Sequence, residues 1–365
     1  MKIPTTQYPI LNPNSMRKPL LLFLCFLAAA GLLSPVRAVA QSFAHAGEYI
    51  SFIGAQHHEI TKDMMSYTSA VAHGKSARKI ENRRKEMLQT VTDARRKIAS
   101  LPPYQGDKSL RDSTARFLLA YYHILNDDYG KIVNLEEVAE QSYDAMEAYL
   151  LAQELAGNKI NEAGNRLDNI QKAFAATHKV TLVESSDEVT KKFAEAAKVN
   201  EYHRVVYLLF FKSYKQEMYL IDAVDKKNIN AVEQNKNTLQ KYAEENIQKL
   251  AAIPAFNGDK SLVNVCRQIQ EFYRSESDKI AVLTNFYLKE ENFQKIKQAF
   301  EDKREKDRTQ ADVDQYNNAL KEVNQAINEF NSTNKQLFEA RKQMVESWNK
   351  ASQQFLDKHV PKYKA

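Results

Sequence analysis

Apolar residues recur every three or four positions along most of the chain, the spacing of one face of an α-helix. The first stripe consists of Ile50, Ile53, His57, Ile60, Met64, Tyr67 and Val71. A second helix is predicted to begin near Ser76, and its stripe consists of Ile80, Met87, Val91, Ala94, Ile98 and Leu101. Glycine and proline, which interrupt helices, number only nine each in 365 residues. The pattern therefore predicts an all-α protein.

One ten-residue segment occurs twice. Residues 101–110 read LPPYQGDKSL and residues 253–262 read IPAFNGDKSL, at an offset of 152 residues. Proline ends the preceding helix, glycine permits a positive φ, and Asp107 and Asp259 suit the N-cap of the next helix. Gly-Asp-Lys-Ser is also part of phosphate-binding loops, but the first glycine of that motif is absent and no strand precedes it. We interpret both segments as turns between helices.

The repeat extends into the flanking helices. At the same offset the second stripe corresponds to Val232, Leu239, Ala243, Asn246, Leu250 and Ile253. The last helix of each half aligns at an offset of 181 residues, and both halves end in a histidine, His178 and His359. The difference, 181 − 152 = 29 residues, predicts an insertion near 285–312, which contains the charged run 301–308.

Each half thus carries four striped helices with short connections. Such helices bury their stripes against one another in an antiparallel bundle. We expect two tandem, duplicated four-helix bundles, at residues 41–180 and 188–365, with a connector at 181–187. The Ser and Asp residues at the end of this connector suit a new N-cap.

The first 40 residues have the three-part pattern of a cleaved signal peptide. Two basic residues precede an apolar run at 20–33, and residues 38–40, Ala-Val-Ala, offer a small-residue cleavage site. Cleavage there would leave Gln41 as the first mature residue. We expect an exported protein that is periplasmic or lies on the cell surface.

The most apolar stretch after the leader is 204–224. It is interrupted too soon for a bilayer span by Lys212, Lys215, Gln216 and Glu217. We expect an enclosed helix and no transmembrane segment in the mature chain. A peripheral membrane contact is the alternative.

Removal of the leader changes what the charge implies about partners. The leader holds four basic residues and no acid, so the formal charge of +6 becomes 6 − 4 = +2. A near-neutral chain lacks the clustered basic footprint of nucleic-acid binding, and no nucleic-acid partner is expected. Only Cys266 of the two cysteines remains, which excludes an intramolecular disulfide in the mature chain. Its position on an apolar stripe predicts a buried, inert thiol.

Three histidines of the first half are the candidates for a metal or haem site. His57 and His58 directly precede Glu59 and lie near Asp63 in the sequence, and His123 lies one turn before Asp127. The chain has no Glu-x-x-His, the motif of carboxylate-bridged metal sites in bundles. At the 152-residue offset the three histidines correspond to Leu209, Phe210 and Ser275. Half-buried histidines without a ligand are therefore favoured, and no cofactor is expected.

The predicted second helix is strongly basic. Residues 75–97 include nine bases and three acids, whereas the matching segment 227–249 has four bases and three acids. A basic helix face is able to bind an anionic envelope polymer or lipid headgroups. The favoured interpretation is a solvated face, or one paired with acids of a neighbouring helix at 136–147. The candidate binding residues are four arginines and four turn residues: Arg83, Arg84, Arg95, Arg96, Tyr104, Asp107, Phe256 and Asp259.

With its leader, the Ala-Val-Ala site and two Gly-Asp-Lys-Ser-Leu turns, the chain resembles uncharacterised exported or surface proteins of Gram-negative bacteria built from repeated helical bundles. The resemblance implies an interaction role in the envelope and specifies no substrate.

No nucleophile elbow, zinc-protease motif or glycine-rich loop after a strand is present. We expect a non-enzymatic binding or scaffolding protein that contacts an envelope protein or an anionic envelope component. A metal- or haem-binding bundle using His57, His58 or His123 is the alternative. The oligomeric state stays open.

Overall fold

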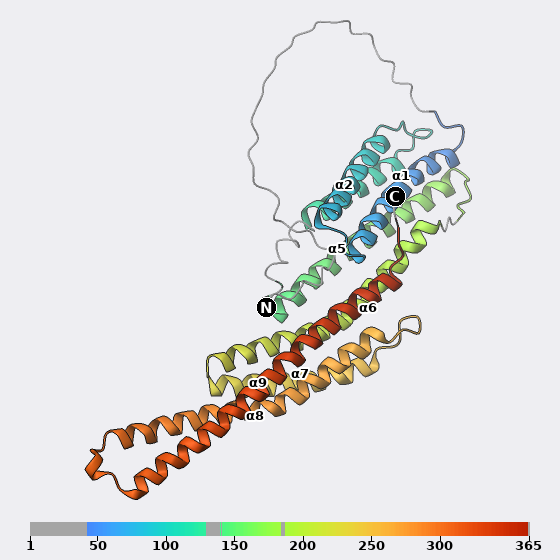
Figure 1. Ribbon diagram of the computed structural model, residues 1–365. Helices are drawn as coiled ribbons and strands as arrows, with labels where there is room; N and C mark the ends of the chain where they lie inside the picture. The colour runs from blue at the N-terminus through green and yellow to red at the C-terminus, as the bar shows by residue number, and fades with distance from the viewer. Residues whose placement is uncertain (1–41, 129–138, 140, 184–186, 364–365) are drawn as a thin grey trace, which may run out of the picture. The chain divides into compact units, whose positions relative to one another are not determined.

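The computed structural model describes residues 42–128, 139, 141–183 and 187–363 (Figure 1). Over these residues the fold is all-helical, with eight α-helices and no β-strand. The prediction of an all-α protein is confirmed. The predicted signal peptide lies outside the described residues.

The chain divides into two compact units. The second unit is Lys198–His359, and the first consists of the described residues up to Ala197 together with residues 360–363. The division falls within a helix, and the predicted connector at 181–187 lies just before that helix.

The first unit contains α1 (Ala46–Ala72), α2 (Ala77–Ala99), α3 (Ser109–His123) and α5 (Tyr143–Thr177), with a π-helical turn, Ile124–Asp128, after α3. Helix α1 lies against α2, α2 against α3, and α3 against α5. Ser76 is the N-cap of α2, as the pattern predicted.

The predicted stripes of α1 and α2 form the core of the first unit. Ile53, Val91 and Ile98 are each at most 2% exposed. The ring of Tyr49 stacks on Phe174 of α5 at 5.7 Å between centroids. Close packing of these side chains, which removes apolar surface from water, stabilises the unit.

The C-terminal residues fold with the first unit. Val360 is 2% exposed. The backbone N–H of Tyr363 donates to Ser69 Oγ of α1 at 3.0 Å. The first unit therefore includes both early and final segments of the described chain.

The second unit contains most of α6 (Glu188–Asp225), with α7 (Ile229–Ala252), α8 (Ser261–Glu301) and α9 (Gln310–His359). Helix α7 lies against α8, and α8 lies against α9 over a long distance (Figure 1). In the core, Trp348 of α9 stacks on Phe210 of α6 at 4.1 Å between ring centroids.

The apolar stretch 204–224 lies in α6. Its polar residues are not all directed to solvent: Lys215 is 8% exposed and Glu217 only 3%. Among the described residues, no helix combines the length and the apolarity needed to cross a membrane.

The charged run at 301–308 joins the two longest helices of the second unit. Helix α8 ends at Glu301 and α9 begins at Gln310, with a 3-10 turn, Glu305–Asp307, between them. Near this turn Phe300 packs on Tyr316 at 4.9 Å, and the Arg308 guanidinium lies 4.5 Å from the Phe300 ring. The charged run is thus the tip of a helical hairpin.

Candidate functional site

The repeated segments fold as the same tight turn in both units. In the first unit, Tyr104 and Asp107 exchange two backbone hydrogen bonds, at 3.1 and 2.9 Å. In the second, Phe256 and Asp259 exchange them at 2.9 and 2.8 Å. Gly106 provides the required positive φ of 87°, a conformation that glycine adopts without strain. The prediction of turns between helices is therefore confirmed.

Contrary to the prediction, neither aspartate is itself the N-cap; each lies one residue before it. The N-caps of α3 and α8 are Lys108 and Lys260. Asp107 Oδ1 nevertheless accepts a hydrogen bond from the backbone N–H of Ser109, the first residue of α3, at 2.8 Å. This hydrogen bond is the main reason why the pKa of Asp107 lies below its ordinary value.

The other oxygen of each aspartate binds the histidine that ends the last helix of the same unit. Asp107 Oδ2 lies 3.1 Å from His178 Nε2. Asp259 Oδ2 lies 2.9 Å from His359 Nε2 and accepts a further hydrogen bond from Lys358 Nζ at 2.7 Å. We call each Asp–His pair with its turn a clasp.

Electrostatics differ between the two clasps. Burial favours the neutral form of Asp259, but the hydrogen bonds from Lys358 and Ser261 outweigh it, so the pKa of Asp259 lies far below its ordinary value. Asp259 is 8% exposed, compared with 25% for Asp107. The second clasp therefore holds its carboxylate ionised in a more enclosed place.

The aromatic turn residues complete the clasps. Tyr104 packs edge-on against His178, with ring centroids 5.1 Å apart, and Phe256 packs edge-on against His359 at 5.2 Å. The four turn residues chosen as binding candidates are therefore engaged within the fold. Their observed contacts connect a turn to the end of a helix.

The first helix of each unit contacts this turn through a tyrosine. Tyr49 Oη donates to Pro102 O at 3.2 Å, and Tyr202 Oη donates to Pro254 O at 2.9 Å. These contacts relate α1 to α6 at an offset of 202 − 49 = 153 residues, one more than the offset of the turns. At this offset His57 corresponds to Phe210, and not to Leu209 as the uniform offset implied.

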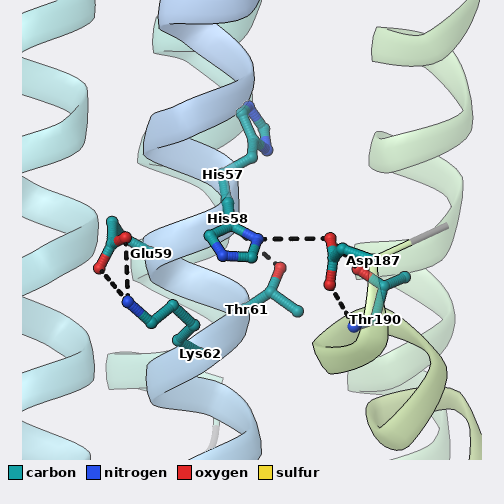
Figure 2. Close-up of polar contacts among 7 residues, drawn as sticks. All are labelled: His57, His58, Glu59, Thr61, Lys62, Asp187 and Thr190. Carbon is teal, nitrogen blue, oxygen red and sulfur yellow. Dashed lines mark hydrogen bonds and ion pairs between the residues drawn. The ribbon is translucent and has the colours of Figure 1, made fainter. Parts of the chain in front are cut away.

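The three candidate metal histidines are apart and differently bonded. His58 Nδ1 lies 3.3 Å from Asp187 Oδ2, while His57 points away from this pair (Figure 2). His123 Nδ1 is bonded to Asp127 Oδ2 at 2.8 Å. Among the residues that the structure describes, no three His, Cys, Asp or Glu side chains are grouped to hold a metal ion.

Nearby acids also have other partners. Both oxygens of Glu59 accept hydrogen bonds from Lys62 at 3.1 Å (Figure 2). Asp63 accepts from Thr90 Oγ1 at 2.6 Å. Asp187 is also hydrogen bonded to the backbone N–H of Thr190 and so caps α6. These carboxylates serve contacts between or within helices.

His57 packs against an aromatic ring. Its imidazole stacks on Phe117 at 5.6 Å between centroids, and its buried Nε2 has no hydrogen-bond partner. Burial lowers the pKa of His57 to about 4. The side chain therefore stays neutral at neutral pH, as an apolar neighbour requires.

The basic helix is α2, and it carries eight bases and three acids. Three of the four candidate arginines pair within the helix: Arg83 with Glu86 at 3.0 Å, Arg84 with Glu81 at 3.0 Å, and Arg96 with Asp93 at 3.4 Å. Arg95 is exposed and has no ion pair in the described part of the chain, and the same holds for Arg78 and Lys79.

The structure describes only some of the acids expected as alternative partners of α2. Those at 136, 137 and 140 lie outside the described residues. Glu147 accepts a hydrogen bond from Tyr143 of its own helix at 3.1 Å. The surface of α2 therefore keeps an excess of exposed positive charge among the described residues.

A buried polar network occupies the second unit, and sequence reasoning missed it. Ser213 donates to Gln270 Oε1 at 2.6 Å, and Asn246 Nδ2 donates to Ser213 Oγ at 3.0 Å. All three side chains are completely buried. Cys266 is buried beside them, and burial raises the pKa of its thiol to about 12, as expected for an inert thiol.

Three charged residues form a second buried group, which we call the charged cluster: Glu217 of α6, Glu276 of α8 and Arg341 of α9. Arg341 Nε donates to Glu217 Oε1 at 3.1 Å and to Glu276 Oε1 at 2.7 Å, and Arg341 Nη2 also bonds Glu276 Oε1. The side chains of Glu217 and Glu276 are 4% and 0% exposed. The signal in the sequence was Glu276 itself, an acid on an otherwise apolar stripe.

Comparisons with known proteins add no function to this geometry. Scans against protein-family models, curated proteins and solved structures each found no match.

Proposed function

We propose that this is a non-enzymatic, exported binding or scaffolding protein of the cell envelope, which presents α2 to an anionic envelope component. One observation carries the proposal. Arg78, Lys79 and Arg95 are exposed and lack a carboxylate partner among the described residues, on a helix with eight bases and three acids. Exposed charge of one sign attracts partners of the opposite sign.

The second unit offers a comparison. Its helix α7 takes the place of α2 and has three bases and three acids. The recurrence of the turn, the clasp and the tyrosine contact supports an internal duplication into two tandem four-helix bundles. If the halves arose in this way, the basic surface belongs to one copy and is not needed for the fold.

Export follows from the leader pattern at residues 1–40. The near-neutral mature charge and the lack of a second mature cysteine are compatible with an envelope location. The predicted mature chain begins at Gln41, and the mass of the protein isolated from the envelope would test that start.

The binding proposal predicts loss of capture on charge reversal. The variant Arg78→Glu/Lys79→Glu/Arg95→Glu is mixed with vesicles of equimolar phosphatidylglycerol and phosphatidylcholine, and separately with lipopolysaccharide. Each base near an anionic surface contributes about 1 kcal/mol, so removing three is expected to weaken binding about a hundredfold or more. Binding of the unmodified protein should also weaken as salt increases, because exposed charges are screened.

A matched control carries the same change in charge on the second unit. Lys249, Lys321 and Lys335 are exposed, and reversing all three should leave capture unchanged. Equal weakening by both triple variants would assign capture to net charge and reject α2 as the surface. Capture of neither probe by the unmodified protein would reject an anionic phosphate-bearing partner.

A metal or haem protein is the less favoured candidate. His58 and His123 each bond an aspartate, and His57 stacks on Phe117. No observation on the described residues brings the three imidazoles together.

A further inference from the structure

The two units provide matched positions for comparing their interiors. The tyrosine contacts relate α1 to α6 at 153 residues, the turn aspartates relate α3 to α8 at 152, and the clasp histidines relate α5 to α9 at 181. At these offsets the charged cluster corresponds to three apolar residues of the first unit, Met64, Ile124 and Ile160. Met64 and Ile160 pack against the core there, and Ile124 is 9% exposed.

Charged side chains are not required to fill these three buried positions. Removing charges from water is expensive, and a well-packed apolar set is commonly as stable as a buried ion pair or more so. The matched residues of the first unit show that apolar side chains suit this kind of position. The charges of the second unit therefore call for another explanation.

Charge balance within the cluster is incomplete. Two carboxylates face one guanidinium, so the ionised cluster would carry one uncompensated negative charge in a buried place. The contacts of Arg341 with Glu276 go to Oε1, whereas Glu276 Oε2 is buried and has no donor. Both carboxyl groups bond the same Arg341 Nε, so they lie close to each other. A proton between them would supply the missing donor and neutralise the cluster.

We propose that the charged cluster is a buried binding site for one proton, shared between Glu217 and Glu276, and that loss of this proton loosens the second unit. The site takes a proton and no larger ligand, because its polar atoms lie in direct contact with one another. The first unit, with apolar residues at the matched positions, lacks the site.

Two neighbouring groups oppose the proton, but burial outweighs them. From α8, Tyr273 lowers the pKa of Glu217, and the charge of Lys279 lowers that of Glu276. From α6, Tyr214 acts on Tyr273. The buried residues of α7 are Val232, Leu239, Ala243, Asn246 and Leu250, none of which titrates. Arg341 is the cation from α9.

The pKa shifts have the same sign. Burial, followed by the charge of Glu276, raises the pKa of Glu217 well above its ordinary value. Burial also raises the pKa of Glu276, although Arg341 opposes it. A carboxyl group whose folded pKa is raised stabilises the fold below its unfolded pKa, near 4.5, and loses that contribution as pH rises through the folded value.

The experiment measures unfolding of the second unit between about pH 7 and about pH 9. Trp348 is the single tryptophan of the chain and is fully buried in this unit, so its fluorescence follows this unit alone. Release of one proton on unfolding raises the unfolding constant by up to tenfold per pH unit. The full mature protein is expected to show this rise in urea titrations.

Two variants separate the shared proton from other causes. Glu217→Gln replaces the protonated acid by a neutral amide, and its unfolding constant should lose the rise. The triple variant Glu217→Met/Glu276→Ile/Arg341→Ile copies the first unit and should also lose it. In contrast, Arg341→Met leaves the acids without a cation and should steepen the rise.

Infrared spectroscopy gives a direct reading that does not depend on unfolding. The folded protein at neutral pH should show the carbonyl band of a protonated carboxylic acid, and Glu217→Gln should lack it. Absence of this band from the unmodified protein would overturn the proposal. A pH dependence that persists in both Glu217→Gln and the triple variant would also overturn it.

Discussion

His57 gives the sharpest prediction about the first unit. Replacing it by phenylalanine, the residue at the matched position 210, keeps an aromatic ring against Phe117 and removes the buried imidazole. Because burial lowers the pKa of His57 to about 4 from 6.5, the unfolded chain binds a proton more readily than the folded one. The stability that depends on neutral His57 is present above pH 6.5 and is lost as the pH falls towards 4.

The magnitude follows from these two pKa values. At about pH 5 nearly every unfolded imidazole is protonated, whereas about a tenth of the folded ones are. The difference destabilises the fold by about 2 kcal/mol at that pH and by less than about 0.1 kcal/mol at about pH 7.5. When the pH is lowered from about 7.5 to about 5, the free energy of unfolding of His57→Phe should therefore rise by about 2 kcal/mol relative to that of the unmodified protein.

Urea titrations at the two pH values provide the assay. Far-UV circular dichroism reports both units, and fluorescence of Trp348 reports the second, so the effect should appear in the ellipticity. Phe117→Leu is the control, since it alters the same contact without removing a titrating group and should shift stability equally at both pH values. A pH-dependent gain for His57→Phe below about 1 kcal/mol would refute the reasoning.

Two further predictions concern the clasps and the core of the second unit. Asp259→Asn should lower the free energy of unfolding by about 2–3 kcal/mol, and Asp107→Asn should lower it by about 1 kcal/mol. The difference is expected because only Asp259 also binds Lys358. Equal urea midpoints for the two variants would contradict it. Cys266 should resist a thiol reagent in the folded protein, since the thiol is buried and burial raises its pKa to about 12. Labelling of Cys266 should therefore follow unfolding in urea. Rapid labelling of the folded protein would show that this part of the core opens.

The helices were predictable because their apolar stripes have the period of a helix. The start of α2 after Ser76 and the turns at Gly106 and Gly258 depend on local backbone preferences that a sequence shows directly. The excess of bases on α2 is likewise a property of the amino-acid sequence alone. Local chemistry therefore accounts for most of the predicted fold.

The offset between α1 and α6 was missed because it depends on one residue in a turn. After α1, Lys75 N bonds Ala70 O and a further residue, Ser76, serves as N-cap. After α6, Asn228 N bonds Ala223 O and Asn228 also serves as N-cap. The second turn is shorter by one residue, so the preceding helices align at a different offset.

The charged cluster was hidden for another reason. Glu217 is one of the polar residues that interrupt the apolar stretch at 204–224, and the direction of its side chain depends on the packing of three helices. Arg341 and Glu276 are 341 − 276 = 65 residues apart, and no local pattern relates them. Contacts between distant segments determine such sites, and a single sequence does not contain that information directly.

Salt and pH separate the two proposals. Arginine stays charged throughout the accessible pH range, so the exposed arginines of α2 should bind an anion as strongly at about pH 9 as at about pH 7, while salt weakens that binding. The charged cluster is shielded from salt by burial and responds to pH, because its cation is fixed and its acids share one proton. A salt-dependent capture with no pH dependence would thus support the surface alone. A pH-dependent fluorescence transition that is insensitive to salt would support the buried site alone.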